Sequence, residues 1–73
     1  MTTYKLYMAG FSETPNAAMT INQQPQISFI FAPQNPDYEA FKAQINADEA
    51  QLEDADGVLM TPEQARAYVA TLP

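Results

Sequence analysis

The amino-acid sequence predicts an α+β fold: a small antiparallel sheet of about three strands plus a short hairpin, packed against two short helices. Three observations lead to this prediction. Side chains alternate between apolar and polar near the N-terminus, Asn35-Pro36 and Thr61-Pro62 are typical helix starts, and Asp56-Gly57 is a strong turn signal between them. With 73 residues, the chain is expected to form a single small domain over residues 1–73.

The first predicted strand is Thr3–Met8, because β-prone residue types alternate there with period two. Its apolar face comprises Tyr4, Leu6 and Met8. The following residues, Ala9–Ala18, contain glycine, serine, proline and asparagine and are predicted to form a loop.

A hairpin is predicted next, with strands Met19–Gln23 and Gln26–Phe31 joined around Gln24-Pro25. The second of these strands is apolar, β-prone and uncharged. Since buried strands have this composition, we expect Gln26–Phe31 at the centre of the sheet. The alternative is an edge strand that pairs with another chain.

Two helices are predicted in the C-terminal half, at about Pro36–Asn46 and Pro62–Leu72. Each follows a capping side chain and opens with proline, which suits the first helical position. Thr61 and Gln64 have the spacing of a capping box. The apolar stripes expected to face the sheet are Tyr38, Phe41 and Ile45 on the first helix, and Ala65, Tyr68, Val69 and Leu72 on the second.

An acidic segment separates the two helices, and we predict a short hairpin there, with Gln51–Glu53 and Val58–Met60 flanking a turn at Asp56-Gly57. The acids of Asp54–Gly57 also partly match the spacing of a calcium-binding loop. Leu52 would occupy the first ligand position of that loop and cannot coordinate calcium. The favoured interpretation is a solvated turn, and cation binding stays an alternative.

The composition argues against most kinds of catalytic, metal-binding and phosphate-binding site. The chain has no histidine and no cysteine, so it lacks the commonest general base and the usual zinc ligands. No phosphate-binding glycine loop is present. We therefore predict no enzyme activity, no catalytic residues, no cofactor and no metal site. A net charge of −6 disfavours nucleic acid and anionic membrane surfaces as partners.

A domain this small gains from contact with a partner, and the partner expected here is a protein. Four tyrosines and four phenylalanines are present, and core packing accounts for most of them. Tyr7, Phe11 and Ile30 are predicted to lie off the core face, where uncovered apolar side chains form docking surfaces. These three are the candidate partner-binding residues.

From Asn35 onward, the sequence resembles short bacteriophage-encoded proteins associated with tails or virions. These share an Asn-x-Asp-Tyr helix start with a Phe-Lys pair, an acidic Asp-x-Asp-Gly turn, and a Met-Thr-capped helix ending in Leu-Pro. The resemblance covers about half of the chain, and the matching residues are Asn35, Asp37, Tyr38, Phe41, Lys42, Ile45, Leu52, Asp54, Ala55, Asp56, Gly57, Met60, Thr61, Leu72 and Pro73. It implies a structural or accessory virion role and brings no catalytic residues.

The leading hypothesis is therefore a non-enzymatic, virion-associated interaction protein, a tail or capsid accessory that contacts virion components or itself. The alternative is an acidic host-directed regulator, whose five acids around one turn would bind a basic surface of a host protein. The expected location is the virion, or the host cytoplasm during infection.

Overall fold

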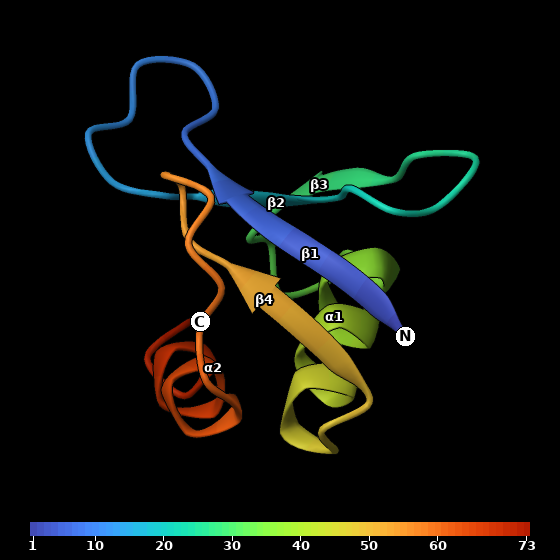
Figure 1. Ribbon diagram of the computed structural model, residues 1–73. Coiled ribbons are helices and arrows are strands. Elements are labelled where there is room, and N and C mark those ends of the chain that lie inside the picture. The colour runs from blue at the N-terminus through green and yellow to red at the C-terminus, as the bar shows by residue number, and fades with distance from the viewer.

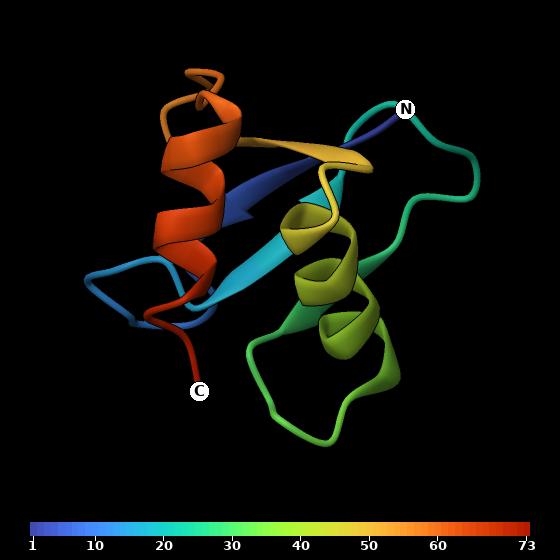
Figure 2. The same ribbon diagram turned by 90° about the horizontal axis from the view of Figure 1, so that it is seen from below.

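One mixed sheet of four strands, in the order β3-β2-β1-β4, organises the computed structural model, which describes residues 1–73 (Figure 1). The elements are β1 (Thr2–Tyr7), β2 (Ala17–Thr20), β3 (Ser28–Ile30), α1 (Pro36–Asn46), β4 (Ala50–Glu53) and α2 (Pro62–Val69). Both helices lie against the same face of the sheet, as the view from below shows (Figure 2). The predicted α+β fold is confirmed.

The strand β1 lies inside the sheet and is paired on both sides, antiparallel with β2 and parallel with β4. Because β2 and β3 are also antiparallel, β3 and β4 run in the same direction at opposite edges. The chain must cross the sheet between them, and α1 makes this crossing over one face. The segment predicted as a separate hairpin strand thus joins the main sheet as a parallel fourth strand.

The core lies between the sheet and the helices, and aromatic rings fill its centre. Tyr4 and Phe41 meet edge to face, with ring centroids 5.0 Å apart, and Phe31 stacks on Phe41 at 6.0 Å. The Tyr4 hydroxyl donates a hydrogen bond of 2.7 Å to Oε1 of Gln44, so this buried polar group is satisfied. Burial, and secondarily the charge of Asp37, raises the pKa of Tyr4.

Both predicted helix starts are confirmed. The Asn35 side chain accepts the N–H of Asp37 at 2.9 Å, and Thr61 and Gln64 form the reciprocal capping box. The first helix has the predicted bounds, but the second ends at Val69 instead of Leu72. After Val69 the chain turns more tightly, because the N–H groups of Thr71 and Leu72 bond the carbonyls of Tyr68 and Val69, and Pro73 disfavours helical geometry at Leu72.

The prediction that Gln26–Phe31 is central was wrong, since β3 is an edge strand. The central place goes to β1, which has six residues and is paired on both sides, whereas β3 has three. The apolar content of β3 has a local cause. Phe29 is buried under α1, where it packs against Tyr38 and Phe41, while Ile30 points to the other face and is 54% exposed.

The bounds of β2 also differ from the prediction. Ala17 and Ala18, which were expected in a loop, begin the strand, and it ends at Thr20 instead of Gln23. Alanine has little β-propensity, so the pattern did not reveal these two positions. Side chains supplement the backbone bonds at this end of the strand: the Gln26 amide donates to the Thr20 carbonyl at 2.9 Å, and the Thr20 hydroxyl accepts the N–H of Ile27 at 2.9 Å.

Candidate functional site

The face of the sheet opposite the helices has no helix or strand packed on it and is the candidate functional surface (Figures 1 and 2). We call it the open face. The strand register determines which side chains it presents, because residues paired across strands lie on the same side. These side chains are Thr3, Lys5 and Tyr7 of β1, Ala17 and Met19 of β2, Ser28 and Ile30 of β3, and Gln51 and Glu53 of β4.

At the start of β1, the open face is polar and satisfied within the chain. Asn22 accepts the backbone N–H of Thr3 at 2.9 Å, and the Thr3 hydroxyl donates to Oε1 of Gln51 at 3.2 Å. Thr3 is buried by these neighbours. This end of the face offers few free polar groups to a partner.

At the other end of the open face, an apolar row crosses three strands. Tyr7 pairs with Ala17, and Ala17 pairs with Ile30, so the three side chains lie side by side. Strands are spaced by about 4.8 Å, which puts Tyr7 and Ile30 roughly 10 Å apart. Ala17 is completely buried, Tyr7 is half-buried and Ile30 is exposed. The predicted placement of Tyr7 and Ile30 off the core face is thus confirmed.

Phe11 lies in the β1–β2 connection, residues 8–16, which rises on the open side of the sheet next to Tyr7 (Figure 1). Its side chain is 106% exposed, more than any other large apolar residue of the chain. The base of the connection is fixed, because the Asn16 side chain accepts the N–H of Ala9 at 2.7 Å and donates to its carbonyl. Gly10, with φ of +68°, makes the turn immediately before Phe11.

The sequence prediction for Met8 was wrong. Met8 was expected on the buried face of the first strand, but the strand ends at Tyr7 and the Met8 side chain is 46% exposed. Gly10 nearby was the available signal, because glycine with other turn residues marks the end of a strand. We define the apolar end of the open face as Tyr7, Ala17 and Ile30, together with Phe11 in the adjoining connection.

The acidic turn is held by one of its own carboxylates. Oδ1 of Asp54 accepts the backbone N–H groups of Asp56 and Val58, each at 2.9 Å. Gly57 takes the left-handed conformation, with φ of +86°, and its N–H bonds the Asp54 carbonyl at 3.0 Å. Three or more acidic side chains do not converge anywhere in a geometry that would hold a metal ion. The Asp54 carboxylate therefore acts within the turn, which leaves fewer free acids for a basic partner than the sequence indicates.

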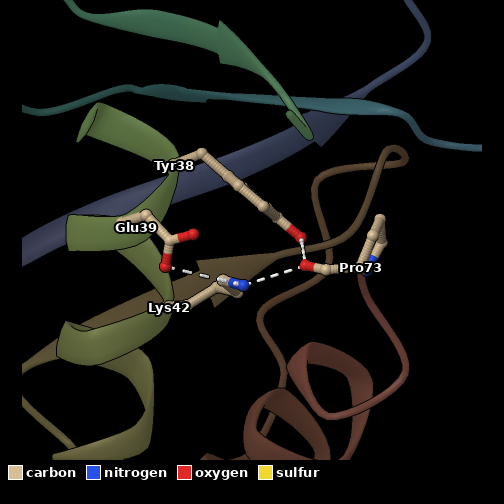
Figure 3. Close-up of polar contacts among 4 residues, drawn as sticks. All are labelled: Tyr38, Glu39, Lys42 and Pro73. Carbon is tan, nitrogen blue, oxygen red and sulfur yellow. Dashed lines mark hydrogen bonds and ion pairs between the residues drawn. The ribbon is translucent and has the colours of Figure 1, made fainter. Parts of the chain in front are cut away.

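A second cluster of polar contacts joins α1 to the last residue of the chain (Figure 3). The carbonyl oxygen of Pro73 accepts hydrogen bonds from the Tyr38 hydroxyl at 2.6 Å and from Nζ of Lys42 at 2.8 Å. Lys42 also lies 3.7 Å from a Glu39 carboxylate oxygen and 4.5 Å from the Tyr38 ring centroid. Burial, followed by the nearby Glu39 and Tyr68, raises the pKa of Tyr38. The polar groups of this cluster bond one another, so the cluster stabilises the contact between α1 and Pro73.

The most apolar hollow of the molecule lies beside β4, where the chain enters α2. It has a volume of about 450 Å³, and its apolar lining includes Ala50, Leu52, Met60 and Ala65. Its lining also includes the polar residues Asp48, Gln51 and Thr61. Neither helix has both the length and the apolarity needed to cross a bilayer.

Comparisons of the chain with known protein families, with curated proteins and with solved structures find no match.

Proposed function

We propose that the chain is a non-enzymatic interaction protein that docks onto another protein through the apolar end of its open face. The observation that supports this most strongly is Phe11, a fully exposed aromatic residue in the connection that follows Tyr7. A phenylalanine gains roughly 1.5–3 kcal/mol when it is fully buried. In the isolated chain none of that gain is realised, and a partner surface that covers Phe11 would realise it.

We further propose that the partner is a component of a phage virion. This part of the proposal rests on the resemblance of residues 35–73 to short virion-associated phage proteins. A standard interface buries about 800 Å² per partner, and its core is rich in aromatic side chains. Tyr7, Phe11 and Ile30 would supply such a core on this chain, with the satisfied polar end of the open face at its rim.

The test is to ask whether the chain is incorporated into purified particles and whether Phe11 is needed for that. Phe11→Ser removes the exposed ring and should leave the folded chain intact, because Phe11 contributes no burial to it. Val58→Ser is the matched control, since Val58 is 61% exposed but lies at the opposite edge of the sheet. Quantitative mass spectrometry of particles measures the copy number of each variant.

We expect the unaltered chain and Val58→Ser in particles at equal copy number. The loss of roughly 1.5–3 kcal/mol of burial should reduce the affinity of Phe11→Ser about tenfold or more. Absence of the unaltered chain from particles would refute the virion part of the proposal. Salt-sensitive capture of a host nucleic-acid-binding protein in its place would favour the acidic regulator.

A further inference from the structure

The outer edge of β3 carries backbone groups that have no partner in the chain. Hydrogen bonds to β2 extend beyond the strand itself, from Thr20 N–H to the Ile27 carbonyl at 2.8 Å and from Phe31 N–H to the Asn16 carbonyl at 2.9 Å. Along a strand of an antiparallel ladder, the N–H and C=O groups of successive residues point alternately toward the paired strand and away from it. Ser28 and Ile30 therefore direct their N–H and C=O groups outward. Among these groups only the Ile30 carbonyl is bonded, to the N–H of Ala32 at 2.9 Å.

The opposite edge of the sheet is covered. The chain folds back after the acidic turn, and Met60 N–H bonds the Leu52 carbonyl of β4 at 2.9 Å. A bridge between Glu53 and Leu59 continues this cover. The β3 edge has no such cover, and Gln26–Phe31 contains neither the charge nor the proline that commonly protects an edge strand. One edge is therefore closed, and the other is open to a further strand.

The charge distribution indicates what kind of strand could pair with the β3 edge. The chain has a net charge of −6, yet residues 14–36, which include β2, β3 and their connections, contain no charged side chain. The next acid along the chain, Asp37, begins α1 on the covered face. A second copy of this acidic chain can therefore approach β3 without bringing charged strand residues together. A basic partner would find nothing on this strand to bind.

We propose that β3 pairs antiparallel with β3 of a second copy, about a two-fold axis at Phe29. In this register Ser28 of each copy faces Ile30 of the other. The Ile30 N–H donates to the Ser28 carbonyl, and the Ser28 N–H donates to the Ile30 carbonyl, which accepts this bond in addition to the one from Ala32. A symmetric dimer interface requires such a self-complementary edge. The two sheets become continuous, and the apolar ends of both open faces point to the same side.

The dimer does not depend on the proposed docking function, and its test uses the chain alone. Sedimentation equilibrium of the full chain, from micromolar concentrations to about 1 mM, measures the dissociation constant. The range extends to high concentration because so short a contact lies at the small end of known interfaces. Ile30→Lys places a lysine on the pairing edge, which is a natural device against strand addition. Val58→Lys changes the net charge equally at an exposed site on the opposite edge.

We expect the unaltered chain to dimerise within this range, Ile30→Lys to weaken the dimer about tenfold or more, and Val58→Lys to leave it within about twofold. Phe11→Ser should leave the dimer unchanged, which separates this inference from the docking function. A chain that stays monomeric throughout, or equal effects of the two lysine variants, would overturn the proposal.

Cross-linking then tests the register. The chain has no cysteine, so any disulfide comes from the introduced residues. Facing residues of such a pair have Cα atoms about 5.5 Å apart, within the range of a disulfide. Mixing Ser28→Cys with Ile30→Cys chains under mild oxidation should give the mixed dimer in preference to either self-pair. Equal yields of all three products would contradict the two-fold axis at Phe29.

Discussion

Replacement of Asp54 tests whether the acidic turn is a structural device. In Asp54→Ala the backbone N–H groups of Asp56 and Val58 lose the Oδ1 acceptor that lies 2.9 Å from each. Each such hydrogen bond contributes a net 0.5–1.5 kcal/mol or so. Asp56 and Val58 are exposed, so water replaces part of the loss, and we expect a cost of about 1–2 kcal/mol in unfolding free energy. For a domain of this size that lowers the thermal midpoint by about 4–8 °C per kcal/mol.

The matched variant is Asp54→Asn, whose amide oxygen can still accept both hydrogen bonds. We expect it to lose less than half as much stability as Asp54→Ala. Thermal unfolding followed by circular dichroism, with 10 mM calcium or with chelator, also tests the calcium alternative. A site with a dissociation constant of 1 mM would raise the stability by about 1.4 kcal/mol at that concentration.

We expect the same midpoint in calcium and in chelator for the unaltered chain and for both variants. The structural account of Asp54 would be refuted by an Asp54→Ala chain as stable as the original. A calcium-dependent rise that disappears in Asp54→Asn would restore the metal interpretation.

Two further predictions concern stability. Asp48 follows α1 with φ of +58°, and the N–H groups of Asp48 and Glu49 bond the carbonyls of Ile45 and Gln44, the pattern of a helix end that favours glycine. Asp48→Gly should therefore raise the unfolding free energy by about 0.5–1 kcal/mol, measured by urea denaturation, and a loss of stability would contradict this. Burial raises the pKa of Tyr4, Tyr38 and Tyr68. Their contribution to stability is complete below the unfolded pKa of about 10 and is lost as the pH rises through the folded values, so urea midpoints should fall above about pH 10 and a flat profile would oppose the assignment.

The helices were predictable because their signals are local. Asn35-Pro36 and Thr61-Pro62 determine the first turn within a few residues, and the predicted stripe of α1 is the buried one. Only the end of α2 differed, where Pro73 acts on the residue before it. Such signals do not depend on what the helix packs against.

The strand order was not predictable in the same way. A strand at the edge of a sheet still needs apolar side chains on the face that a helix covers. Phe29 and the residues two positions before and after it meet that need, so the composition of Gln26–Phe31 does not distinguish an edge strand from a central one. The position of β3 depends on β4 pairing with β1, two segments more than forty residues apart in the sequence. Local alternation did place Tyr7 and Ile30 off the core face. Their alignment across Ala17 depends on the register of two strand pairs, which no single segment specifies.

The two helices are long enough to cover one face of the sheet. Helices of 11 and 8 residues are about 16 Å and 12 Å long, enough to cover one face of a four-stranded sheet about 15–20 Å wide. Neither helix covers the other face, so its side chains must tolerate water or be covered by another surface. At the start of β1 they tolerate water, because Thr3, Asn22 and Gln51 satisfy one another. At the apolar end, Phe11 is fully exposed and Ile30 is 54% exposed, so both keep apolar surface in water that the proposed docking would bury.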